Sequence, residues 1–183
     1  KWDGTHVAIS AVMLAMLLHL FFIPEVGGAY SEIRGNAEMF PLNGPHWSLF
    51  FEYIGNIFYG LLIRRMSTAM LTVWTIVIGA AFAVFGISDI VGYGNIGVGW
   101  TLDGMNFWGG LLRMLFPFSC GLLMSRVFKP IKICGAFWLC TILIVIFLSV
   151  PNLGSVNCIY EVMCVIIVFP IVVYLAASGQ NTD

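Results

Sequence analysis

Six long apolar stretches constrain the fold of this chain more than any other feature. A helix needs about 20 apolar residues, at about 1.5 Å rise per residue, to cross the hydrocarbon core of a bilayer. The stretches that approach this length are residues 6–23, 47–63, 68–87, 107–127, 133–150 and 159–177. Of the 183 residues, 60% are hydrophobic and 9% charged, against about 45–50% and about 25% in soluble domains. We expect an all-α integral membrane protein with about six transmembrane helices, forming one membrane-embedded domain over residues 1–183.

The positive charges lie mostly on one side of this predicted topology. Of eight lysines and arginines, only Arg34 falls in a connection on the opposite side, and Arg113 lies within an apolar stretch. The other six are Lys1, Arg64, Arg65, Arg126, Lys129 and Lys132. Basic connections of multi-pass proteins stay in the cytoplasm, so the sequence predicts a protein of the cytoplasmic membrane with these connections inside. The lipid bilayer is one expected partner, and a net charge of −1 excludes nucleic acid.

The cysteines carry no metal-binding pattern. The chain has five, none of them paired as Cys-x-x-Cys or followed by histidines at zinc-ligand spacing. Cysteine is readily buried as a small apolar residue. We therefore expect them to pack between helices or face lipid, and we expect no metal site.

A short polar loop followed by an apolar stretch with one carboxylate is the least ordinary segment of the chain. Asn43, Gly44 and Pro45 are turn-forming residues, and Glu52 lies inside the apolar stretch that begins at Trp47. An ionisable side chain at membrane depth is costly, so it usually has a function or a partner. Glu52 is therefore a candidate functional residue.

Three titratable residues share one predicted depth. Glu52 and Arg113 each lie six residues into a helix that enters from outside, about 9 Å below its outer end at about 1.5 Å per residue. His19 lies five residues before Pro24 on a helix that leaves toward the outside, at about 7 Å. Because buried charges usually pair, Glu52 and Arg113 are the natural pair. The alternative is an ion pair that only holds two helices in register, and His19 could simply hydrogen-bond across helices.

Two segments resemble a known family of membrane enzymes. Residues 42–52 read Leu-Asn-Gly-Pro-His-Trp-Ser-Leu-Phe-Phe-Glu, which resembles the Asn-Gly-Pro-x-Trp-Ser-Leu-x-x-Glu signature of acyltransferase family 3. Residues 113–121 read Arg-Met-Leu-Phe-Pro-Phe-Ser-Cys-Gly. They are similar to a second block of that family, an arginine on a helix that ends in Phe-x-x-Gly.

The resemblance implies a bundle of about ten helices, each crossing the bilayer. It also implies transfer of an acyl group, usually acetyl from acetyl-coenzyme A, onto an envelope carbohydrate or a similar acceptor. The family's first helix carries a basic residue followed eleven positions later by a histidine thought to be catalytic. Val12 stands eleven positions after Lys1, and Ala8 stands eleven before His19, so this chain has no such pair. We expect the chain to be the middle of a longer protein, truncated at both ends and inactive alone.

The resemblance and the depth argument together define a candidate site. Glu52 and Arg113 are expected to take part in catalysis, with an acyl-coenzyme A as donor and a carbohydrate as acceptor. The expected substrate-binding residues are Asn43, His46, Trp47 and Ser48. A multi-pass transporter or polysaccharide-export subunit, with the same charges forming a substrate or proton site, is the alternative, and a purely structural membrane subunit is a third possibility.

Overall fold

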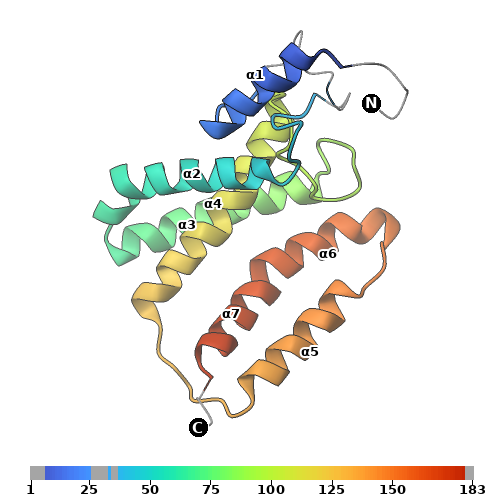
Figure 1. Ribbon diagram of the computed structural model, residues 1–183. Helices are drawn as coiled ribbons and strands as arrows, with labels where there is room; N and C mark the ends of the chain where they lie inside the picture. Colours follow the sequence, from blue (N-terminus) through green and yellow to red (C-terminus); the bar gives the residue numbers. More distant parts are fainter. Residues whose placement is uncertain (1–6, 26–32, 34–36, 180–183) are drawn as a thin grey trace. The chain divides into compact units, whose positions relative to one another are not determined.

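The chain folds into helices joined by irregular loops (Figure 1). The computed structural model describes residues 7–25, 33 and 37–179. The α-helices are α1 (Ile9–Leu20), α2 (His46–Leu61), α3 (Thr68–Ile87), α4 (Gly104–Val127), α5 (Ala136–Leu148), α6 (Asn157–Met163) and α7 (Phe169–Ala177). Within the described residues there is no strand, and the two isolated β-bridges join Glu38 to Thr101 and Ile133 to Gly179. The predicted all-α class is confirmed for this part of the chain.

Three helical segments are long and apolar enough to cross a membrane. They are Thr68–Ile87, Gly104–Val127 and Gly154–Ala177, with 20, 24 and 24 residues. At about 1.5 Å per residue, 20 residues reach about 30 Å, the thickness of the hydrocarbon core. The first of these segments has the bounds that the sequence predicts. Its start is fixed by Ser67, whose side chain accepts a hydrogen bond from the amide of Met70 at 3.2 Å and so caps the helix.

The other predicted spans fold as shorter helices. α1 has 12 residues and α5 has 13, which gives each a length of only about 18–20 Å. α1 ends before Pro24, and α5 begins only after Gly135, which has a φ of 71°. α2 has 16 residues. Six full-length spans were predicted. In the described residues, three of the six stretches form helical segments long enough to cross a membrane.

Two compact units make up the chain. One consists of Lys1–Leu61 and Gly97–Met114, and the other of Leu62–Ile96 and Leu115–Asp183. The first half of α4 belongs to the first unit and its second half to the other. All of the predicted site residues lie in the first unit.

The core of the first unit forms where α2 meets the start of α4. Met39, Phe40 and Phe51 are fully buried at its centre. Gly99 and Gly110 let the loop and α4 approach closely, because a Cβ on Gly110 would lie only 2.4 Å from the Cα of Gly99. The side chains packed around this centre are Trp47, Phe50, Ile54, Leu102, Phe107, Leu111 and Met114.

A buried asparagine fastens the loop before α4. The side-chain oxygen of Asn106 accepts hydrogen bonds from the backbone amides of Gly99, Trp100 and Thr101, at 2.6, 3.0 and 3.3 Å, and Asn106 is 0% exposed. The carbonyl of Trp100 in turn accepts from the amide of Met39 at 2.9 Å. One side chain thus holds the loop against α4 and, through Trp100, supports the segment that leads into α2.

We expect Asn106→Leu to lower the free energy of unfolding clearly. Leucine cannot accept the three amide hydrogens, and each buried amide left without a partner costs about 1–3 kcal/mol. Asn56→Leu is the matched control, because Asn56 is exposed on α2 and its side-chain amide donates to the Glu52 carbonyl within the same helix; its effect should stay within about 0.5 kcal/mol. Unfolding of both variants in detergent micelles measures the difference. Equal stabilities would show that Asn106 does not hold the loop.

In the second unit, α3 packs on the second half of α4. The rings of Phe82 and Phe116 are stacked with centroids 6.3 Å apart, and the indole nitrogen of Trp74 donates to the hydroxyl of Ser119 at 3.0 Å. Gly79 leaves room for the Phe116 ring, since a Cβ there would lie 2.8 Å from it. Aromatic packing and one hydrogen bond therefore set the register of this helix pair.

Polar side chains join the loop after α3 to α6 within the same unit. The carboxylate of Glu161 accepts from the amide of Ile96 at 2.7 Å and from the side-chain amide of Asn157 at 2.8 Å. Asn157 also donates to the carbonyl of Gly94 at 3.0 Å, and Asp89 accepts from the amide of Gly94. Because these groups satisfy one another, we assign them a structural role.

A π-helical turn, Cys164–Val168, lies between α6 and α7 and keeps the helical run unbroken. Pro170 follows at the start of α7. Beyond the turn, the thiol of Cys140 on α5 contacts the carbonyl of Val172 on α7 at 3.6 Å. Before the turn, the hydroxyl of Tyr160 donates to the carbonyl of Phe147 at 2.6 Å. The two ends of the run therefore both contact the α5 segment.

Candidate functional site

The polar segment before α2 folds as a turn that starts the helix. The amide of Asn43 donates to the carbonyl of Phe40 at 3.2 Å, and the amide of His46 donates to the carbonyl of Asn43 at 3.0 Å. The hydroxyl of Ser48 donates to the carbonyl of Pro45 at 2.9 Å. Its proton is therefore used within the turn, although its oxygen can still accept a hydrogen bond. Asn43 is exposed, and Ser48 is half-buried.

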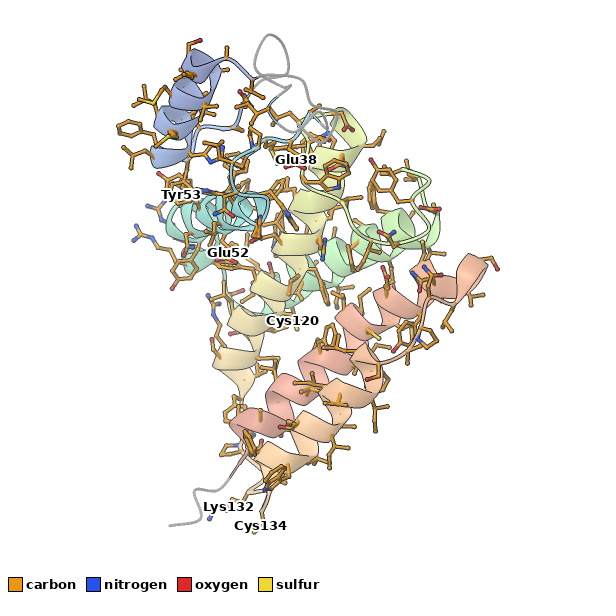
Figure 2. All side chains as sticks on the ribbon, turned by 45° about the vertical axis from the view of Figure 1, so that its right-hand side comes forward. Glu38, Glu52, Tyr53, Cys120, Lys132 and Cys134 are labelled. Carbon is orange, nitrogen blue, oxygen red and sulfur yellow. The ribbon has the colours of Figure 1, made fainter. Side chains whose placement is uncertain are left out.

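The two faces of α2 differ sharply. Phe51 and Gly55 are buried against the core, whereas Glu52 and Tyr53 are exposed, and both of these side chains extend from α2 in Figure 2. Successive residues of an α-helix are about 100° apart around its axis. The packing of Phe51 toward α4 therefore turns the Glu52 carboxylate away from the buried face.

Arg113 contacts an aromatic ring of α2. Its guanidinium lies 5.2 Å from the centre of the half-buried Trp47 ring. Such a cation–π contact contributes about 0.5–2 kcal/mol, which offsets part of the about 2.5–3.5 kcal/mol that an arginine costs at membrane depth. Within the described residues the structure records no ion pair between Arg113 and Glu52. Trp47 is therefore one partner of Arg113.

Two histidines from different elements meet at the start of α2. His19 from the last turn of α1 and His46 from the first turn of α2 have ring centroids 5.3 Å apart, at an interplanar angle of 72°. Phe40 stacks on His46 at 4.7 Å and 15°, and its edge-on contact with His19 is 5.1 Å. Phe22 meets His46 edge to face at 4.7 Å. The two imidazoles therefore lie in an aromatic cluster made of His19, Phe22, Phe40 and His46.

This region also contains buried polar atoms without hydrogen-bond partners among the described residues. They are Nε2 of His19, Nε2 of His46 and both carboxylate oxygens of Glu25. His19 is 9% and Glu25 4% exposed. Burial raises the pKa of the Glu25 carboxyl above its ordinary value. Unsatisfied buried groups are rare in folded proteins and often mark functional sites.

The meeting of the two histidines was not predicted. The sequence placed His19 about 7 Å below the outer surface, at the level of Glu52 and Arg113, whereas His46 stands at the outer end of the next helix. The contact between the two rings and the burial of Glu25 were therefore both missed. The residue pattern contains no signal for the burial of Glu25, because that depends on its backbone bond to the carbonyl of Met39, at 2.9 Å.

The described residues contain no group of three or more histidine, cysteine, aspartate or glutamate side chains placed to hold a metal ion. Comparison with protein-family models, with curated proteins and with solved structures finds no match to the chain. Any function must therefore be inferred from the residues and their geometry.

Proposed function

We propose that this chain belongs to an integral membrane O-acyltransferase, which moves an acyl group, in particular acetyl, from an acyl-coenzyme A to a hydroxyl of an envelope carbohydrate or a similar acceptor. The observation that carries the proposal is the contact between Trp47 and Arg113. These two residues come from the two segments that resemble acyltransferase family 3. They are far apart in the sequence, yet the ring and the guanidinium are 5.2 Å apart. Two segments of one catalytic site should meet in this way.

The proposed roles follow from charge and exposure. The exposed carboxylate of Glu52 orients the acceptor or a group that handles the acyl transfer. Arg113, positioned by Trp47, holds an anionic part of the donor, since its fork of donors suits phosphate and carboxylate. Asn43, His46, Trp47 and Ser48 line the acceptor site, where amide, hydroxyl and aromatic groups suit a sugar.

The reaction is a balanced acyl exchange. The acceptor hydroxyl loses its proton to a base as its oxygen bonds to the carbonyl carbon of the thioester. The carbon–sulfur bond then breaks, and the thiolate of coenzyme A leaves and takes up a proton. The products are an ester and free coenzyme A, so no oxidant or metal is needed.

The proposed location is the cytoplasmic membrane, with the basic connections inside. Three helices long and apolar enough to cross a bilayer support membrane association. Arg64, Arg65, Lys129 and Lys132 are all exposed in the described part, as residues of cytoplasmic connections should be.

The test measures acetyl transfer by cells with and without the gene. Membranes holding the full-length protein are supplied with acetyl-coenzyme A labelled in the acetyl group, and label is counted in the carbohydrate fraction of the envelope. We expect alkali-labile label only when the gene is present. A strain that loses export of the carbohydrate but not its acetylation would instead favour a transporter, and no change in either would leave a structural subunit.

A further inference from the structure

Three aromatic side chains surround the ring of His46. Phe40 covers one of its faces at 4.7 Å, and Phe22 and His19 approach edge to face at 4.7 and 5.3 Å. Such aromatic contacts each contribute about 0.5–1.5 kcal/mol. Together they fix the direction of the imidazole nitrogens before any ligand arrives. A reactive group gains most from this kind of preorganisation.

The Nε2 atoms of the two histidines bring no stability. Nε2 of His19 and Nε2 of His46 are buried without a partner among the described residues, and an unsatisfied buried group of this kind costs about 1–3 kcal/mol. Phenylalanine at either position would supply the same aromatic contacts without that cost. The two imidazoles are therefore better explained by a ligand that uses an Nε2 atom than by packing.

His46 is the less buried member of the pair, but its Nε2 atom is itself buried, so an acceptor reaches this atom only when a neighbouring side chain moves aside. The His46 side chain is half-buried, whereas His19 is 9% exposed. His46 also follows directly after the Asn43–Gly44–Pro45 turn, where the acceptor site is proposed. His19 contacts His46 and Phe40 from the α1 side, so its influence on a bound acceptor passes through the His46 ring.

We propose that His46 is the base that removes the proton of the acceptor hydroxyl, and that His19 is a positioning residue that fixes the His46 ring. This inference rests on the proposed acyl transfer. Nε2 of the neutral His46 imidazole takes the hydroxyl proton while the oxygen bonds to the thioester carbon. The thiolate that leaves accepts a proton, directly or through water, from the imidazolium, which returns His46 to its neutral form. An imidazole that accepts at Nε2 carries its own proton on Nδ1.

The experiment compares two replacements of His46 in the full-length protein. His46→Phe keeps an aromatic ring in the cluster, and His46→Asn keeps a polar group. The donor is labelled acetyl-coenzyme A and the acceptor is the envelope carbohydrate fraction. We expect kcat to fall about 10²- to 10⁴-fold in both variants, with the KM for acetyl-coenzyme A unchanged. His46→Phe should melt at the same temperature as the wild type or higher. His6→Asn, which changes the third histidine of the chain, is the matched control and should retain full activity.

A double-mutant cycle tests the role of His19. If His19 acts only through His46, then His19→Asn lowers kcat in the wild-type background but lowers it no further in His46→Phe. Imidazole added to His46→Gly should restore part of the transfer, because a free base can enter the space that the ring leaves.

The outcomes separate this inference from the proposed function. If wild-type membranes transfer no acetyl, both fail. If they do, and both His46 variants keep the wild-type kcat, only the assignment of His46 is overturned. Additive losses from the His19 and His46 substitutions would overturn the positioning role.

Discussion

Glu52→Gln is expected to abolish most acceptor acylation in the full-length protein while leaving its membrane insertion intact. Glutamine has the shape of glutamate but lacks the charge with which Glu52 orients the acceptor or the group that handles the acyl transfer, and misplacing a reacting group by about 1 Å can cost about 10²-fold in rate. Insertion should not suffer, because removing a charge lowers the cost of burying this helix in lipid. Labelled acetyl in the carbohydrate fraction measures activity, and the amount of protein in washed membranes measures insertion.

Tyr53→Phe is the control for that experiment. Tyr53 is the exposed neighbour of Glu52 on α2, and its ring stacks on Phe22 at 6.2 Å. The variant removes one hydroxyl and keeps the ring, so acylation should continue. Acylation at the wild-type rate by Glu52→Gln would remove Glu52 from the site, whatever the fate of the other residues.

Gly110→Ala is expected to destabilise the first unit by about 1–3 kcal/mol, the usual cost of overpacking a core. Alanine favours a helix over glycine by about 1 kcal/mol, which alone would stabilise α4. However, the new Cβ would lie 2.4 Å from the Cα of Gly99 and 2.7 Å from the Phe51 ring. A backbone atom cannot move aside as the end of a side chain can, so the clash should outweigh the gain.

Gly121→Ala is the matched control on the same helix. A Cβ at this position has no atom within 4 Å, so only the helix preference acts. We expect it to stabilise the protein by about 0.5–1 kcal/mol. Unfolding in detergent should therefore shift in opposite directions for the two variants. A shift in the same direction would mean that the crossing of Gly99 and Gly110 is not a tight one.

The sequence was a good guide to where helices form and a poorer guide to where they end. Apolar composition located each α-helix of the described part of the chain, and it gave the bounds of α3 as the structure has them. It could not show that α1 would stop near Leu20 or that α5 would begin only at Ala136. Those ends depend on the backbone conformation of single residues near Pro24 and Gly135, and the average hydrophobicity of a stretch does not reveal such conformations.

The predicted contacts of the site rested on charge, whereas the observed contacts depend on how the side chains pack. Opposite charges at one depth suggested that Glu52 would meet Arg113. The rotation of α2 is set instead by Phe51, which packs against α4 where Gly110 leaves room. That rotation brings Trp47 to Arg113 and leaves Glu52 exposed. The catalytic and substrate-binding roles assigned to these residues stay predictions until activity is measured.

The π-helical turn between α6 and α7 behaves as a single extra residue in an otherwise α-helical run. Removing one residue from Cys164–Val168 would let the run rewind as a regular α-helix, and everything after it would rotate by about 100°. Val172 would then leave Cys140, whereas Tyr160, which precedes the turn, would keep its bond to Phe147. The length of this short segment, more than its side chains, therefore decides which face α7 presents to α5.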